Sequence, residues 1–322
     1  MIILTGGAGF IGSVVLEGLN RKGINDILVV DALRTAEKWK NLSTKQFADY
    51  CDKNDLFERL LSVDPKTVEA VIHLGACTST TETDADYLMR NNYQYSKTLA
   101  EWCFANDIRF IYASSAASYG KGEQGFSDDK ETTAKLRPLN IYGYSKHVFD
   151  QWIIRNGYEN RCVGLKFFNV FGPNEYHKGS MASLIYKAYH QILHTNSVNL
   201  FKSYHPDYKD GESVRDFIYV KDTADVILWA LETPSANGIF NLGRGEAVSW
   251  NSIVTSIFFA MDRKPSISYI EMPAEIRPNY QYYTKAEMGK LRAAGYTKPF
   301  TDITASVHEY IRDFLMQDQP YL

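Results

Sequence analysis

The feature that most constrains the fold lies at the N-terminus. A short apolar run, IILT, leads into GGAGFIG; a segment with helical periodicity follows from Val14 to Arg21, and a second apolar run, DILVVD, ends at Asp31. This order predicts strand, turn, helix and strand. A turn without Cβ atoms lets backbone N–H groups meet a pyrophosphate at the start of a helix. The glycines that form this predicted dinucleotide-binding turn are Gly6, Gly9 and Gly12.

Further apolar runs suggest a sheet built from this unit. VEAVIHLGA, RFIYASS and RCVGLKFFNV cover residues 68–76, 109–115 and 161–170, and helical patterns lie near 84–106 and 143–156. Continuous apolar runs are typical of strands that are buried on both faces of a parallel sheet. The alternation of strands and helices therefore predicts an α/β protein with a Rossmann-type, doubly wound parallel sheet.

The pattern changes after FFNVFGPNEYHKG. A helix is expected near 180–194, the stretch KSYHPDYKDGES is polar and poor in strand signals, and RDFIYVKDTADVILWALE restores a strand and a helix. We expect residues 1–170 and 216–240 to form a dinucleotide-binding Rossmann domain, whose cofactor the resemblance described below implies to be NADP. The remaining residues, 171–215 and 241–322, are expected to form a smaller mixed α/β substrate-binding domain.

Composition excludes several classes of function. The net charge is −3 without long blocks of one sign, which argues against a nucleic-acid partner. The four cysteines form no CxxC pair, so neither a zinc site nor a disulfide framework is expected, and no metal dependence is predicted. No apolar stretch approaches the ~18–20 residues of a spanning helix, and no basic segment precedes an apolar leader. We expect a cytoplasmic protein without a membrane partner.

The choice of dinucleotide stays open at the level of single residues. Asp31 ends the second predicted strand, where a carboxylate that accepts the ribose hydroxyls favours NAD. Arg34 and Lys38 follow closely, and these cations suit the 2′-phosphate of NADP. Asp49, in FADY, is expected to approach the adenine, with a solvated loop aspartate as the alternative.

A second constellation indicates general acid–base chemistry. Tyr142 and Lys146 stand four residues apart in YGYSK, so on a helix they share one face. A nearby ammonium stabilises a phenolate and lowers the tyrosine pKa from about 10 toward the working pH. Ser115, at the end of a predicted strand, would bind the same substrate oxygen. The sequence holds a second YxxxK, Tyr93 to Lys97, to which we assign a structural role because it lies inside the preceding helix.

The chain resembles the extended short-chain dehydrogenase/reductase family that acts on nucleotide sugars. The segments that carry this resemblance are GGAGFIG, VIHLGA, SSAASYG, YGYSK and RDFIYVKD. Further segments are similar to those of one branch of that family, which epimerises an ADP-heptose at carbon 6. In chain order these segments are DILVVD, TSTTE, NNYQYSK, FFNVFGP, HKGSMAS and LRAAGYTKPF. This resemblance implies an NADP-dependent isomerase, with NAD as the alternative cofactor. It also implies an ADP-heptose substrate, a role in lipopolysaccharide inner-core precursor synthesis, and a homo-oligomer.

The reaction is constrained by what stands beside Ser115. Dehydratases of this superfamily carry a carboxylic acid and a carboxylate next to the catalytic serine, whereas this chain has Ala116 and Ala117. Lys178, in YHKGS, is instead a candidate second base. Oxidation and re-reduction on opposite faces of a carbonyl fits two acid/base groups. We expect Tyr142 and Lys178 to flank carbon 6, in an order that the residues leave open, with Lys146 near the nicotinamide ribose.

The resemblance also implies contacts by motif position. For the cofactor these are Gly6, Gly9, Phe10, Ile11, Gly12, Asp31, Ala32, Lys38, Asp49, Lys53, Leu74, Gly75, Ala76, Cys77, Thr78, Ser79, Asn92, Tyr142, Lys146 and Val170. For the substrate they are Ser115, Asn169, Lys178, Ser180, Lys187, Phe201, Lys202, Ser203, Tyr204, Arg215 and Tyr280. The planar fork of Arg215 suits a diphosphate.

Two alternatives compete with this interpretation. One is another nucleotide-sugar epimerase or reductase of the family, such as an enzyme acting at carbon 4 of a UDP-hexose; Lys178 and HKGSMAS argue against it. The other is a non-catalytic redox sensor that binds NADP. Such sensors tend to lose the tyrosine and lysine, but this chain retains Ser115, Tyr142 and Lys146.

Overall fold

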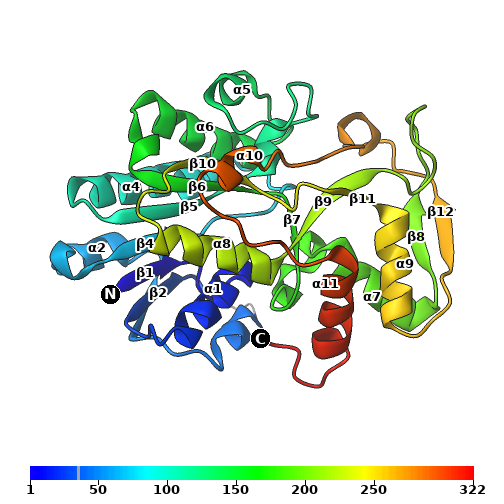
Figure 1. The fold of residues 1–322 in the computed structure, drawn as a ribbon, viewed down its shortest axis with the longest axis horizontal. Coiled ribbons are helices and arrows are strands. Elements are labelled where there is room, and N and C mark those ends of the chain that lie inside the picture. The colour runs from blue at the N-terminus through cyan, green and yellow to red at the C-terminus, as the bar shows by residue number, and fades with distance from the viewer. Residues whose placement is uncertain (35–36) are drawn as a thin grey trace.

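The computed structural model describes residues 1–34 and 37–322, and its centre is a seven-stranded parallel sheet (Figure 1). From one edge to the other, the strands are β10 (Gly238–Leu242), β6 (Cys162–Phe167), β5 (Arg109–Ser115), β4 (Ala70–His73), β1 (Ile2–Thr5), β2 (Ile27–Asp31) and β3 (Asp49–Asp52). The chain order reverses between β1 and β4, and such a switch point is where doubly wound sheets bind ligands. The predicted Rossmann-type α/β fold is confirmed.

Both faces of the large sheet are covered, which explains the continuous apolar runs. Along β1, Ile2 and Leu4 pack in one core and Ile3 packs in the other. The first core contains side chains of α1 (Phe10–Arg21) and α8 (Val220–Glu232). The second contains side chains of α2 (Leu56–Leu60), α4 (Tyr95–Ala105) and α6 (Ile141–Arg155). The sheet is therefore rigid, and its strand ends are fixed in space.

A smaller part of mixed structure lies beside the sheet, on the right of Figure 1. Its three-stranded sheet is β11 (Ala247–Ser249), β9 (Val214–Tyr219) and β7 (Asn169–Phe171), in which β9 pairs antiparallel with β11 and parallel with β7. A parallel pair follows, β12 (Ile267–Ile270) with β8 (Val198–Phe201). The helices that pack here are α7 (Leu184–Thr195), α9 (Trp250–Ala260) and α11 (Ile303–Glu309).

The single strand expected over 161–170 is two strands. β6 ends at Phe167, the backbone N–H of Phe168 donates to the carbonyl of Leu242 (3.0 Å), and β7 then pairs in the small sheet. Residues 216–240 are likewise divided: β9 lies in the small sheet, whereas α8 packs on α1 and β10 edges the large sheet. The division of the chain into two domains stays a prediction.

Two expected helices differ in the structure: the first is interrupted, and the second begins later than expected. Residues 84–106 form α3 (Ala85–Leu88), the π-helical η3 (Met89–Gln94) and α4. The helix expected near 180–194 begins at 184 and follows η6 (Tyr176–Met181). The remaining short elements are η1 (Glu37–Leu42), η2 (Pro65–Thr67), η4 (Ala116–Tyr119), α5 (Lys130–Lys135), η5 (Tyr158–Asn160), η7 (Arg277–Asn279), α10 (Gly289–Ala293) and η8 (Tyr310–Leu315). Within the described ranges, no helix has the length and apolar character needed to cross a bilayer.

Candidate active site

The glycine turn lies at the switch point of the sheet. Gly6 has a φ of +72°, and a Cβ there would lie 2.7 Å from the backbone nitrogen of Gly75, which follows β4. A Cβ on Gly12 would lie 2.0 Å from the carbonyl oxygen of Gly6. Gly9 precedes α1 without a side chain that could cap the helix. The backbone is thus open to close approach by a pyrophosphate at the positive end of α1.

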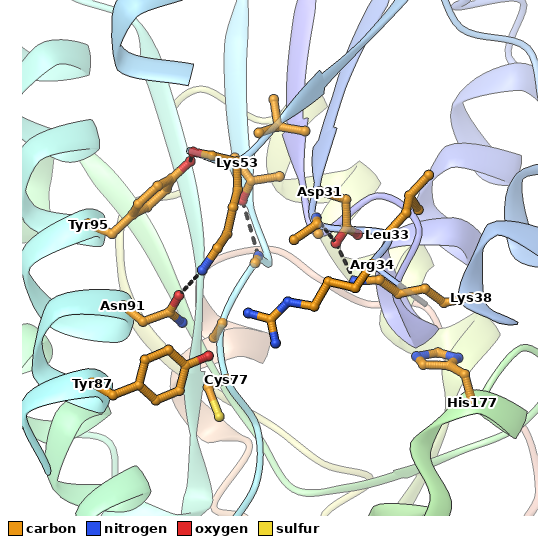
Figure 2. Close-up of a pocket in the computed structure, with 16 residues that line it drawn as sticks. Asp31, Leu33, Arg34, Lys38, Lys53, Cys77, Tyr87, Asn91, Tyr95 and His177 are labelled. Carbon is orange, nitrogen blue, oxygen red and sulfur yellow. Dashed lines mark hydrogen bonds and ion pairs between the residues drawn. The ribbon is translucent and has the colours of Figure 1, made fainter. Parts of the chain in front are cut away.

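Two adjoining pockets open at the carboxyl ends of the strands. The central pocket is lined by the glycine turn together with Ser115, Tyr142, Lys146 and Lys178. The basic pocket is lined by Arg34, Lys38 and Lys53, beside Asp31 (Figure 2). Shared lining residues make the two pockets one continuous cleft; these are Gly6, Asp31, Lys38, Gly75, Ala76 and His177.

This cleft brings together most of the residues expected to bind a cofactor. Those that line one or both pockets are Gly6, Gly9, Phe10, Ile11, Gly12, Asp31, Ala32, Lys38, Lys53, Leu74, Gly75, Ala76, Cys77, Thr78, Ser79, Tyr142, Lys146 and Val170. They come from the turn after β1 and the start of α1, from the end of β2 and the segment that follows it into η1, from the loops after β3 and β4, and from α6 and β7. These elements are far apart in the sequence. The arrangement therefore fits an extended dinucleotide.

Asp31 is almost fully engaged by its own chain. One carboxylate oxygen accepts the N–H of Ala8 (2.9 Å), and the other accepts the N–H of Ala32 (2.7 Å) and the ammonium of Lys38 (2.5 Å). Figure 2 shows Arg34 reaching into the same space between Lys38 and Lys53. Burial and the neighbouring Arg34 cation lower the pKa of Lys53. Three cations thus face one carboxylate, which makes the basic pocket a place for an additional anion.

Two residues expected at the cofactor do not line the cleft. Asp49 begins β3 instead of following a strand, lies level with Leu28 in the register, and forms an exposed ion pair with Arg59 (2.7 Å). The correction has a simple cause, because parallel strands place Asp49 toward the edge opposite the glycine turn. Asn92 is buried, and its side-chain amide accepts from the N–H of Cys77 (2.9 Å) and donates to its carbonyl (3.0 Å). It supports the loop after β4.

Ser115 and Tyr142 meet in the central pocket. Ser115 ends β5, and its hydroxyl accepts from the N–H of Ala117 (3.1 Å). Tyr142 lies in the first turn of α6, where the side chain of Asn140 caps the helix by accepting from the N–H of Gly143 (2.8 Å). Burial raises the pKa of Tyr142, and a hydrogen bond with Ser115 opposes that shift. The two hydroxyls are placed to share one substrate oxygen.

Lys146 lies one turn after Tyr142 on α6, at the wall of the central pocket. Its ammonium donates to the carbonyl of Ala113 on β5 (2.9 Å), and burial lowers its pKa to about 8. An effect of Lys146 on the pKa of Tyr142 stays a prediction.

A buried polar network behind Lys146 was not anticipated. Asp150 accepts from Lys166 (2.7 Å), Ser114 (2.7 Å) and Tyr112 (2.9 Å), and all four side chains are buried. The charge of Asp150 opposes the effect of burial on the pKa of Lys146. The available signal was its position four residues after Lys146 on one helix face. The network fixes α6 against β5 and β6, and so fixes the pocket wall.

Lys178 reaches the central pocket from a separate element. It lies in η6, and its ammonium sits 5.2 Å from the ring centroid of Phe10 at the start of α1. Burial lowers its pKa, and Glu175 opposes that effect. Two titratable side chains, Tyr142 from α6 and Lys178 from η6, therefore line one cavity beside the glycine turn. This juxtaposition suits proton removal and return at two positions around a bound substrate.

Most residues expected to bind the substrate lie outside this cleft. The predicted substrate contacts that line neither pocket are Asn169, Ser180, Lys187, Phe201, Lys202, Ser203, Tyr204, Arg215 and Tyr280. Arg215 is buried, with its guanidinium 5.4 Å from the ring centroid of Trp250 and 5.5 Å from that of Tyr280. Lys202 and Tyr204 are exposed and both contact Glu271. Only Ser115 and Lys178, of the predicted substrate contacts, are assembled in the cleft.

Fold and site together define a dinucleotide-binding protein of the Rossmann type. Residues 2–243 match the model of the NAD dependent epimerase/dehydratase family, and the chain belongs to this family. Its cofactor is accordingly a nicotinamide nucleotide.

Relatives narrow the comparison. The chain is 53% identical over 323 residues to the ADP-L-glycero-D-manno-heptose-6-epimerase of Nitratidesulfovibrio vulgaris strain Hildenborough, and 46% identical over 332 residues to that of Fusobacterium nucleatum; both matches cover 100% of each chain. The solved Helicobacter pylori ADP-L-glycero-D-manno-heptose-6-epimerase superposes with a TM-score of 0.81 at 27% identity, over 97% of this chain and 95% of that one. The resemblance inferred from the motifs is confirmed.

Proposed function

We propose that this chain is an ADP-L-glycero-D-manno-heptose 6-epimerase, which interconverts the D-glycero and L-glycero forms of an ADP-heptose for lipopolysaccharide inner-core synthesis. The observation that carries the proposal is the placement of Tyr142 and Lys178 in one pocket beside the glycine turn. The relatives at 53% and 46% identity bear the name of this enzyme along their whole length, and they support the same assignment.

The side chains have separable roles in this proposal. A nicotinamide ring, when bound, supplies an acceptor and donor of hydride. The hydroxyl of Tyr142 and the amine of Lys178 exchange the proton of the oxygen on carbon 6, each serving one face of the carbon. Ser115 holds that oxygen by a hydrogen bond. Lys146 binds the nicotinamide ribose and favours the phenolate of Tyr142. Ala116 and Ala117 leave elimination without an acid or base.

Within this proposal the cofactor is NADP. Both oxygens of Asp31 are engaged by its own chain, so few acceptor positions remain for the ribose hydroxyls that NAD presents. Arg34, Lys38 and Lys53 line the same pocket. A 2′-phosphate would meet these cations in partly buried surroundings, where charge-assisted hydrogen bonds are strong. The basic pocket supports NADP over NAD.

The remaining predictions belong to the same proposal. Arg215 would bind the diphosphate through the N–H groups that remain after its two terminal nitrogens donate to the carbonyls of Val214 and Gln281. The rings of Trp250 and Tyr280 hold its guanidinium in a fixed orientation. The other substrate contacts in the smaller part would complete the nucleotide site when substrate binds. We further propose a cytoplasmic homo-oligomer with no nucleic-acid or membrane partner.

One experiment tests the proposal. Purified protein is analysed by mass spectrometry and absorbance for bound NADP and is then given ADP-D-glycero-β-D-manno-heptose. The expected result is inversion at carbon 6 without net nicotinamide turnover. Turnover of UDP-galactose without conversion of the ADP-heptose would support a carbon-4 epimerase instead. Binding of NADP with conversion of neither sugar would support a redox sensor.

A further inference from the structure

The segment from Gly172 to Ser183 carries Lys178 and is closed by a buried carboxylate. Glu175 is 0% exposed. One of its oxygens accepts from the hydroxyl of Ser183 (2.7 Å) and from the N–H of Gly172 (3.3 Å), and the other accepts from the N–H of Ser183 (2.5 Å). Its side chain thus binds both ends of the segment, and Ser183 is also the N-cap of α7.

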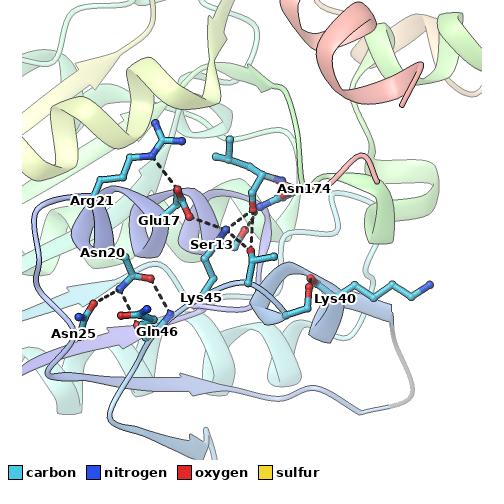
Figure 3. A network of polar contacts seen from close by, with 12 residues as sticks. Ser13, Glu17, Asn20, Arg21, Asn25, Lys40, Lys45, Gln46 and Asn174 are labelled. Atoms are coloured by element: carbon cyan, nitrogen blue, oxygen red, sulfur yellow. Dashed lines mark hydrogen bonds and ion pairs between the residues drawn. The ribbon is translucent and has the colours of Figure 1, made fainter. Parts of the chain in front are cut away.

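The neighbouring residue fixes the same segment to the glycine-turn helix. Asn174 is 0% exposed, and its side chain donates to the hydroxyl of Ser13 on α1 (2.9 Å), as Figure 3 shows. Its backbone carbonyl accepts from the side-chain amide of Asn41 (3.1 Å). Asn41 lies in η1, the element that also carries Lys38 of the basic pocket. The φ of Asn174, +74°, is left-handed, which suits asparagine in a turn. The base of η6 is therefore held on both sides, by α1 through Asn174 and by α7 through Glu175.

A buried carboxylate is costly unless hydrogen bonds and charge compensate it. Three hydrogen bonds engage Glu175, yet none of the ion pairs among the described residues includes it. Burial raises its pKa, with Ser183 and the Lys178 cation acting against that shift. A neutral amide would fill the same volume without the charge. The backbone N–H of Lys178 donates to the carbonyl of Glu175 (3.0 Å), so the acid and the lysine belong to the same turn.

Several other titratable groups face this pair. Burial lowers the pKa of Lys178, Glu175 raises it, and Lys187 of α7 lowers it. The neighbour of Lys178 in η6 is His177. The phenols that face Glu175 are Tyr310 of η8, Tyr176 of η6 and Tyr186 of α7. Glu175 is the acidic group that offsets the burial of the Lys178 ammonium.

We propose that Glu175 is a positioning residue for Lys178, because it closes the turn that carries the ammonium and places a negative charge beside it. The inference rests on the proposed acid–base role of Lys178. It predicts that a neutral residue at 175 alters both the placement and the proton affinity of Lys178, whereas loss of the Ser183 hydroxyl alters the placement alone.

The test compares Glu175→Gln with Ser183→Ala. Lysines are reductively methylated with ¹³C-formaldehyde, and the Lys178 signal is assigned by its absence in Lys178→Met and followed by NMR against pH. In Glu175→Gln we expect this signal to titrate at lower pH than in the unsubstituted protein, while Ser183→Ala leaves it in place. We also expect kcat of Glu175→Gln to fall about tenfold or more, with a smaller change in KM.

An unchanged titration in folded Glu175→Gln overturns the proposal. If that variant does not fold, Glu175→Asp is used, which keeps the charge on a shorter side chain. Its Lys178 signal should titrate as in the unsubstituted protein while kcat falls, and unchanged kcat would overturn the positioning role. The NMR titration does not need a turning-over enzyme. Failure of the unsubstituted protein to invert an ADP-heptose therefore counts against the proposed function and is read separately from this inference.

Discussion

Burial acts in opposite directions on the two proposed proton carriers. It raises the pKa of Tyr142 and lowers that of Lys178, so both groups are moved toward their neutral forms. A neutral phenol donates a proton, and a neutral amine accepts one. Lys146, held by the carbonyl of Ala113, is poised at the wall of that pocket.

Removing either proton carrier should stop epimerisation while the fold survives. We expect Tyr142→Phe and Lys178→Met each to lower kcat about 10²–10⁴-fold, because each loses a general acid–base group. The measurement is the rate of ADP-heptose inversion, followed by NMR. The matched control is Lys97→Met in the second YxxxK, where the lysine is half-buried, pairs with Glu101 and lies outside the cleft. This variant should retain the native rate. Native rates in Tyr142→Phe and Lys178→Met would disprove the roles.

The basic pocket makes a separate prediction about cofactor choice. Lys53→Ala should weaken NADP binding about 10–100-fold and NAD binding much less, since a charged hydrogen bond to a 2′-phosphate is worth roughly 1.5–3 kcal/mol. Titration calorimetry on cofactor-free protein measures both constants. Asp49→Asn is the control, because that exposed side chain pairs with Arg59 outside the cleft. An equal loss of affinity for NADP and NAD would show that the 2′-phosphate does not bind at Lys53.

At the scale of elements, sequence patterns predict the helices, strands and turns whose conformation depends mainly on their own residues. The apolar runs and glycines defined β1, the turn and β2, because burial and backbone freedom at those positions are visible in the residues themselves. The break at Phe168 was not visible, since it depends on the carbonyl of Leu242 and on pairing of β7 with β9. Asp49 was misplaced for the same reason: its register against Leu28 is set by strand pairing.

The strand-turn-helix unit predicts a steric phenotype. Gly12→Ala would place a Cβ 2.0 Å from the carbonyl oxygen of Gly6, so the turn must open. We expect a loss of about 1–3 kcal/mol in unfolding free energy and weaker NADP binding. Denaturant unfolding and cofactor titration measure the two effects. Gly289→Ala, in α10 with no atom within 4 Å of the added Cβ, should leave both unchanged. Native NADP affinity in Gly12→Ala would contradict the proposed pyrophosphate site.

At the scale of the molecule, the candidate site contains two kinds of residue: those that short sequence motifs identify and those that only the packing of the fold brings together. Ser115, Tyr142 and Lys146 stand in short patterns, and the structure brings them to one pocket. The pairs Asp150 with Lys166 and Glu175 with Ser183 are made by folding. The spacing of Asp150 from Lys146 indicates a shared helix face, but it does not identify Lys166 as the partner. The predicted contacts in the smaller part remain predictions, because their residues lie outside the cleft described above.

Buried histidines should make the protein sensitive to acid. Burial lowers the pKa of His73 to about 3, and burial together with the Lys166 ammonium lowers that of His147 to about 4. Below about pH 6.5 the unfolded chain binds protons that the folded chain does not, so the unfolding free energy falls as pH falls. Each such histidine contributes a slope of at most about 1.4 kcal/mol per pH unit.

His147→Gln should flatten this dependence. Denaturant unfolding between about pH 4 and 8 gives the slope for both proteins. The two curves should run parallel above about pH 7 and diverge below it, where the unsubstituted protein loses stability faster. Parallel curves over the whole range would show that His147 takes up its proton in the folded protein.

The small sheet draws its three strands from widely separated stretches of chain, at 169–171, 214–219 and 247–249. No contiguous fragment contains that sheet without also containing α8 and β10 of the nucleotide-binding layer. The sheet therefore cannot be moved to another dinucleotide-binding protein as one contiguous segment. Exchange of this sheet between related proteins would require coordinated replacement of several separate stretches of chain, which restricts the routes open to recombination.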